Sequence, residues 1–64
     1  MTPAARLSAA LVAIGWGPTE LGRQAGINER TVRRWLAGQN EPPGAILAWL
    51  ETLAEFHAAN PAPQ

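Results

Sequence analysis

The chain has 64 residues, 47% of them hydrophobic, and its five arginines and five glutamates leave no net charge. This length allows one domain at most, with a marginal core, because such a chain buries only ~60% of the surface that it exposes when unfolded. The sequence contains no cysteine, lysine or aspartate and a single histidine, His57, which excludes disulfides and argues against a metal site or cofactor.

The predicted elements begin near the N-terminus. Leu7, Leu11 and Ile14 recur at helical spacing and predict a first helix over residues 3–14. The apolar run within it is shorter than the core of a usual secretion signal, and no run approaches the ~20 residues of a membrane span. We therefore expect a soluble cytoplasmic protein. β-Branched residues are sparse and do not alternate with polar ones, so the expected fold class is all-α.

Proline and glycine delimit the second predicted helix. Pro18 suits the first helical position, where its missing N–H is not needed, and Gly26 ends the helix after about two turns. Glu20 occupies the third position after Gly17, so we expect its carboxylate to bond back to the backbone of that cap.

A third helix is expected over residues 29–37, between an Asn28 cap and Gly38. At ~100° per residue, its side chains separate into two arcs without exception. One arc holds Glu29, Arg30, Arg33, Arg34 and Ala37, and the other holds Thr31, Val32, Trp35 and Leu36. The helix is therefore predicted to bury the second arc and to expose a side that carries three of the five arginines.

The fourth helix is expected to begin at Pro43 or Gly44 and to end near His57. Its predicted apolar stripe consists of Ile46, Trp49, Leu50, Leu53 and His57. The last five residues, "NPAPQ" (60–64), are too polar and proline-rich to pack, so we expect a disordered tail there.

Two apolar residues, Leu47 and Phe56, lie partly off the stripe of the fourth helix and are candidate dimer contacts. Leu47 also fits the core, which leaves Phe56 as the better candidate. Trp16, Trp35 and Trp49 are interpreted as core anchors, because large aromatic side chains supply much of the apolar area that a small domain buries.

The stretch "TELGRQAGINERTVRRWLAG", residues 19–38, has the spacing of a helix-turn-helix, in which the second helix enters the DNA major groove. It resembles the motif of the phage repressor and Cro type, that is, of lambda repressor-like proteins. In that family a small residue inside the first helix lets the two helices touch, a glycine makes the turn, and apolar residues join the helices. The corresponding residues are Gly22, Gly26 and the apolar set Leu21, Ala25, Ile27, Val32 and Trp35. The resemblance implies a small four-helix DNA-binding domain over residues 1–59.

Two residues depart from the family pattern. Gly22 stands where alanine is usual, and a glycine within a helix costs about 0.5–1 kcal/mol. Pro18 stands where a glutamine often reaches a phosphate. That contact would pass to backbone N–H groups at this helix N-terminus, which favour anions, or to Thr19.

The resemblance assigns the base-reading positions to Glu29, Arg30, Arg33 and Arg34. Arginine binds guanine O6 and N7 as a bidentate donor, and glutamate accepts from cytosine N4. Alternatively, Glu29 orients Arg33. Candidates for phosphate contacts are Thr19, Arg23, Gln24, Asn28, Thr31, Gln39 and Asn40. For all these residues an ordinary solvated surface is the competing interpretation, since charged helix faces are common.

The resemblance implies a sequence-specific regulator of transcription in a phage or bacterium. We expect a small repressor or autoregulator that binds a palindromic operator in double-stranded DNA as a homodimer at the nucleoid, without a small-molecule ligand. Residues 19–38 hold four arginines and two glutamates, whereas residues 39–64 hold three glutamates and no arginine, so a neutral chain still has a basic side.

Two other classes of function compete with this expectation. The alternative is a protein-binding adaptor or inhibitor with the same fold, which the zero net charge favours. An enzyme is not expected, because Ser8 and His57 are the only serine and histidine and no aspartate is present to orient a base.

Overall fold

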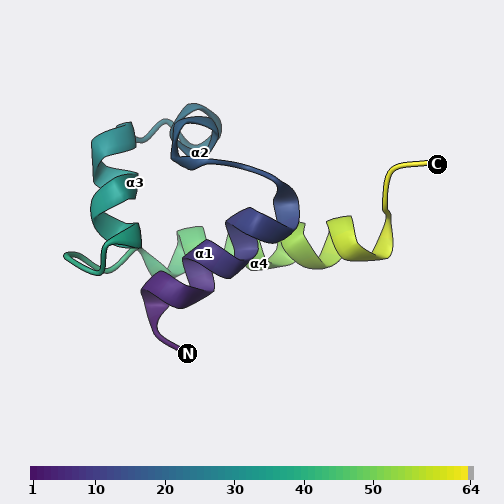
Figure 1. The fold of residues 1–64 in the computed structure, drawn as a ribbon, viewed down its shortest axis with the longest axis horizontal. Helices are drawn as coiled ribbons and strands as arrows, with labels where there is room; N and C mark the ends of the chain where they lie inside the picture. Colours follow the sequence, from purple (N-terminus) through teal and green to yellow (C-terminus); the bar gives the residue numbers. More distant parts are fainter. Residues whose placement is uncertain (64) are drawn as a thin grey trace.

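The computed structural model describes residues 1–63, and over this range its regular structure is entirely helical (Figure 1). The helices are α1 (Pro3–Ile14), α2 (Pro18–Ala25), α3 (Glu29–Leu36) and α4 (Gly44–Ala59). The all-α prediction is confirmed, although α3 ends one residue earlier and α4 two residues later than predicted. Residues 60–63 are exposed and lie outside any helix, and Gln64, the last residue of the predicted tail, lies outside the described residues.

Local signals set the ends of the helices. The Thr2 Oγ1 atom accepts a hydrogen bond from the Ala5 N–H at 3.1 Å, and the Asn28 Oδ1 atom accepts one from the Arg30 N–H at 2.8 Å. The predicted Asn28 cap is therefore confirmed. Gly26 ends α2 with φ +68°, in the left-handed region that favours glycine because it has no Cβ atom. This conformation turns the chain from α2 toward α3.

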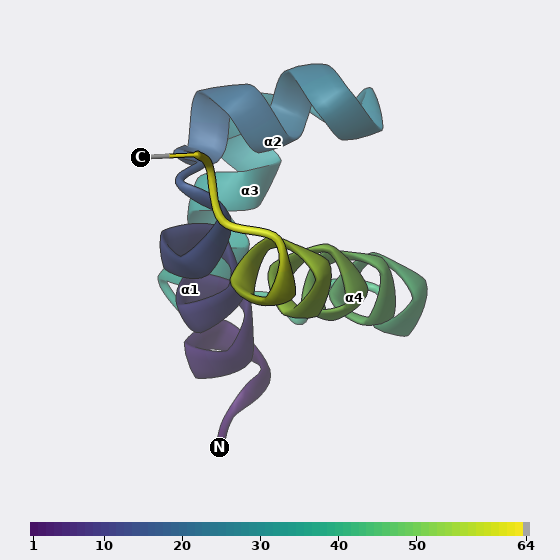
Figure 2. The same cartoon turned by 90° about the vertical axis from the view of Figure 1, so that its right-hand side faces the viewer.

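The four helices share one apolar core in which α1 is central. α1 packs against both α4 and α3, while α2 packs against α3 (Figures 1 and 2). The buried side chains come from every helix: Leu7, Ala10, Leu11, Leu21, Val32, Trp35, Leu47 and Leu50. Four of them, one from each helix, are fully buried. The core that holds α1 and α4 together therefore also holds α2 and α3 in place.

The side of α4 that faces the core differs from the predicted stripe. Leu47 is 4% exposed, so it belongs to the core and is wrong as a candidate dimer contact. Trp49, predicted as a core anchor, is 37% exposed, and His57, predicted on the stripe, is exposed. Trp49 packs at the edge of the core against the half-buried Trp16, with ring centroids 6.0 Å apart and ring planes tilted by 53°. The physical reason is that α4 is apolar almost all the way round, so its pattern does not select one buried side.

The C-terminal part of α4 extends past the other helices. The molecule measures 38 × 25 × 17 Å, and α4 lies along its longest dimension (Figure 1). Phe56 lies in this part of the helix and is 67% exposed. It therefore remains available as the candidate dimer contact.

Gly22 lies where α2 approaches the turn that leads into α3. A Cβ atom on Gly22 would lie 2.6 Å from the Ile27 carbonyl oxygen, a separation that real Cβ atoms essentially never show. The backbone there is also hydrogen bonded, since the Ile27 N–H donates to the Gly22 carbonyl at 2.9 Å. The glycine that departs from the family pattern thus lets the turn close directly against α2.

An ion pair that the sequence did not reveal joins α1 to α4. Arg6 donates from Nε to Glu51 Oε2 at 3.0 Å and from Nη2 to Glu51 Oε1 at 2.5 Å, which is a bidentate arrangement. Hydrogen bonding from Arg6, followed by its positive charge, lowers the pKa of the Glu51 carboxyl below its ordinary value. The two residues are 45 positions apart in the chain, so helical spacing gives no sign of the pair.

Candidate nucleic-acid interface

The residues of α3 divide between the core and the solvent as the two predicted arcs require. Val32 is fully buried, and Trp35 is 6% exposed. The opposite side carries four charged residues, here termed the arginine face: Glu29, Arg30, Arg33 and Arg34. The three arginines are exposed, and Glu29 is half-buried. The apolar side of α3 therefore anchors the helix while the arginines extend into solvent.

The position of α3 leaves its arginine face open within the described part of the chain. The helix packs against α1 and α2, and it lies at the end of the molecule opposite the C-terminal part of α4 (Figure 1). Ala37, which follows the helix on the same arc, is exposed and adds little bulk. A partner can thus approach the eight residues of α3 along their charged side.

The three arginines of this face differ in their partners. The Arg33 Nε atom lies 3.2 Å from Glu29 Oε2, in an ion pair between residues four apart on one helix. Within residues 1–63, neither Arg30 nor Arg34 forms an ion pair. The arginine face therefore presents two unpaired guanidinium groups beside one that a carboxylate already holds.

Glu29 connects the start of α3 to the start of α2. The Thr19 hydroxyl donates a hydrogen bond to Glu29 Oε1, and Arg33 Nε donates to Glu29 Oε2. The bond from Thr19, and then the bond from Arg33, lowers the pKa of the Glu29 carboxyl below its ordinary value. Glu29 is therefore an ionised acceptor at neutral pH. Sequence reasoning missed the bond from Thr19, because residues ten apart on different helices share no helical spacing.

The remaining candidates for phosphate contacts on α2 are Arg23 and Gln24, and both interact with Glu20. Arg23 Nη1 lies 3.8 Å from Glu20 Oε2, and the Gln24 Nε2 atom donates to the same oxygen at 3.4 Å. The expected bond from Glu20 back to the Gly17 backbone is not among the hydrogen bonds of residues 1–63, so that prediction is wrong. The carboxylate turns toward its own helix face instead. The Arg23 side chain is 77% exposed and remains free to reach a phosphate.

The other candidates for phosphate contacts lie on α3 or beside its ends. Asn28 uses its side-chain oxygen for the helix cap, and Thr31 is half-buried on the apolar arc. Gln39 and Asn40 are exposed in the loop that follows α3. Within the described residues, none of these four side chains forms a hydrogen bond with the charged groups of the arginine face.

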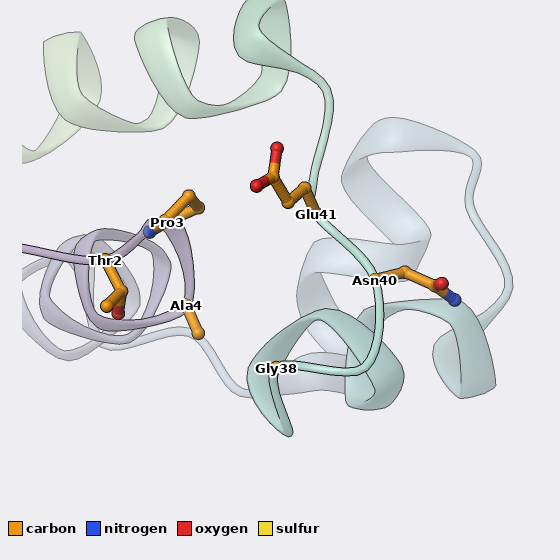
Figure 3. A pocket seen from close by; sticks show the side chains of 6 residues that line it. All are labelled: Thr2, Pro3, Ala4, Gly38, Asn40 and Glu41. Carbon is orange, nitrogen blue, oxygen red and sulfur yellow. The ribbon is translucent and has the colours of Figure 1, made fainter.

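A cavity of about 240 Å³ lies between the N-terminus of α1 and the loop after α3. Its lining consists of Thr2, Pro3, Ala4, Gly38, Asn40 and Glu41. The Glu41 carboxylate points to the side of Pro3, whereas the Asn40 side chain extends to the other side of the loop (Figure 3). A carboxylate at this position disfavours an anion such as phosphate. The cavity therefore does not extend the basic site.

Metal-ligand groups and membrane-spanning helices are absent from the described residues. No group of three or more His, Cys, Asp and Glu side chains within residues 1–63 is placed to hold a metal ion. Over the same residues, no helix combines the length and apolar character that crossing a bilayer requires. The arginine face carries four of the ten charged side chains of the sequence.

Comparison with known proteins identified no similar protein. Searches against protein-family profiles, curated proteins and solved structures gave no significant match to this chain.

Proposed function

We propose that this protein is a sequence-specific DNA-binding regulator of transcription, of the helix-turn-helix type found in lambda repressor-like proteins. In this proposal α2 lies across the DNA backbone and α3 enters the major groove, which is about 12 Å wide and admits an α-helix. The observation that carries the proposal is the arginine face. It is an exposed, charged side of a short helix whose other side is fixed in the core.

The stability of α3 does not explain all the charges of this face. Arg30 and Arg34 are four residues apart, and like charges at that spacing destabilise a helix by about 0.2–0.5 kcal/mol, which the Glu29–Arg33 pair offsets. The helix dipole favours Glu29 in the first turn and Arg33 and Arg34 in the last turn, but it does not favour Arg30, which lies in the first turn. Two unpaired arginines side by side instead suit guanine edges and phosphates, which bind guanidinium forks.

The proposed working unit is a homodimer on a palindromic operator. A single domain offers only a few basic side chains, and phosphate neutralisation supplies most non-specific affinity for DNA. Two copies double these contacts, with half-sites about 34 Å apart or a multiple of that distance. Phe56, exposed on the free part of α4, is the proposed contact between the copies. The resemblance to phage repressors favours repression by occupation of the operator.

The decisive experiment selects bound sites from a random double-stranded DNA library and then measures their affinity. The double variant Arg30→Ala/Arg34→Ala is expected to bind the selected site at least about tenfold more weakly, since each bidentate contact with guanine discriminates by about 1–3 kcal/mol. Arg23→Ala removes the same charge from α2. It should weaken all sequences alike and reduce the salt dependence by about one phosphate contact. If the wild-type protein enriches no site, the proposal is wrong.

A second candidate function is a protein-binding module, which the exposed Phe56 favours. Salt distinguishes the two functions. DNA binding should weaken steeply as salt rises, with a slope of about −0.9 in log K per phosphate contacted, whereas an apolar protein contact should change little. Binding to a different protein that resists salt and depends on Phe56 but not on Arg30 and Arg34 would establish the second function.

A further inference from the structure

The Glu29 carboxylate is held from two helices at once. The Thr19 hydroxyl in the first turn of α2 donates to one of its oxygens, and Arg33 Nε on α3 donates to the other at 3.2 Å. Its side chain is 42% exposed, less than the 61% of Arg33. The carboxylate thus lies between the two helices, and the guanidinium lies farther out.

The bond to Glu29 leaves the outer end of Arg33 free. A guanidinium has five N–H donors in a fixed planar fork, and only the Nε–H is used here. The two terminal amino groups retain the spacing that matches guanine O6 and N7. Because a long side chain loses rotamer freedom when it binds, an arginine that is already held loses less than a free one.

A direct contact between Glu29 and a base would break this arrangement. To accept from cytosine N4, the carboxylate would have to turn away from α2 and toward the groove. That movement would release the Thr19 hydroxyl, the Arg33 Nε–H or both. The bonds from Thr19, from Arg33 and from cytosine would all be made to the same ionised carboxylate, so one bond from cytosine does not compensate for the loss of the ion pair with Arg33 and the bond from Thr19.

We propose that Glu29 and Thr19 are positioning residues that hold Arg33 for bidentate recognition of guanine, and that Glu29 itself contacts no base. The inference rests on the proposed function. It assigns a G·C pair, read from its guanine, to the position in the operator that faces Arg33, and it assigns no cytosine preference to Glu29.

The test compares base preferences at each operator position after library selection with five proteins. Arg33→Ala identifies the base pair that Arg33 reads, where the wild type should prefer guanine by roughly 5- to 150-fold. Thr19→Val and Glu29→Gln should each reduce that preference by about two- to tenfold and leave the other positions unchanged. Thr52→Val is the matched control, because the Thr52 hydroxyl is exposed on α4 and donates only to the Ala48 carbonyl. It should change no preference. Circular dichroism checks that all variants fold.

The outcomes separate this inference from its alternatives. If Thr19→Val weakens binding equally for all sequences, Thr19 is a phosphate contact and the positioning role is overturned. If Glu29→Gln abolishes a cytosine preference at a base pair that Arg33→Ala leaves unchanged, Glu29 reads a base and the inference is overturned. If the wild type enriches a site but no guanine preference depends on Arg33, the inference fails while the proposed function stands. If the wild type enriches no site, both fail.

Discussion

Replacing Gly22 by alanine tests how closely α2 approaches the turn before α3. The added Cβ atom would lie 2.6 Å from the Ile27 carbonyl oxygen, about 0.8 Å closer than the 3.4 Å at which ordinary van der Waals contact begins. The obstructing atom belongs to the backbone, so a side-chain rotation cannot relieve the overlap. Either α2 or the turn must shift, and α3 follows the turn.

The magnitude is the difference between two opposing effects. Alanine in place of glycine inside a helix stabilises it by about 1 kcal/mol. Forcing an extra carbon into a packed site costs about 1–3 kcal/mol. A control without the overlap is Gly44→Ala, because Gly44 is the first residue of α4 and nothing lies within 4 Å of the site where its Cβ would be. Gly44→Ala experiences at most the first effect, which is smaller at a helix end than inside a helix, so Gly22→Ala should be less stable than this control by about 1–2 kcal/mol.

Urea denaturation followed by circular dichroism and by tryptophan fluorescence measures this difference, at one fixed protein concentration in case the chain associates. In thermal unfolding, the melting temperature of Gly22→Ala should fall at least about 4 °C below that of the control, since 1 kcal/mol corresponds to about 4–8 °C in a domain of this size. If Gly22→Ala equals or exceeds the control in stability, the close approach of α2 to the Ile27 carbonyl is refuted.

Two further predictions concern the α2–α3 turn and the ion pair between α1 and α4. Gly26→Ala should lower the free energy of unfolding by about 1–2 kcal/mol, because φ is +68° there. Gly17→Ala, with φ −90° and open space around its Cβ position, loses only the preference for glycine over alanine at a helix N-cap and should lower it by less; urea denaturation compares the two. The Arg6 hydrogen bond lowers the pKa of Glu51, so the pair stabilises the fold above the ordinary pKa of 4.5 and this contribution is lost as the pH falls through the lowered folded value. Glu51→Gln should therefore show a smaller fall in melting temperature between about pH 5 and pH 3 than Glu55→Gln, which keeps Glu51; equal falls would contradict the assignment.

Much of the candidate site could be predicted from the sequence because α3 is strongly amphipathic. Its charged and apolar residues separate on the helical wheel, and the core contacts of Val32 and Trp35 follow that separation. The partners of the charged side chains were harder to predict from the sequence. The Glu29–Arg33 pair follows from spacing on one helix, but the hydrogen bond from Thr19 depends on how α2 packs beside α3. Sequence alone therefore left the role of Glu29 open between base contact and positioning.

The sequence by itself determined the helices and their order, since caps, proline, glycine and helical spacing act over a few neighbouring residues. Asn28 and Gly26 show this at the two ends of the turn. Only the tertiary structure decided the rotation of α4, because a helix that is apolar almost all round takes its buried side from its neighbour. It therefore buries Leu47 and leaves Trp49 at the edge of the core. The tertiary structure also explains why residue 22 is a glycine, since the Ile27 carbonyl lies against Gly22 only when α2 and the turn have packed together.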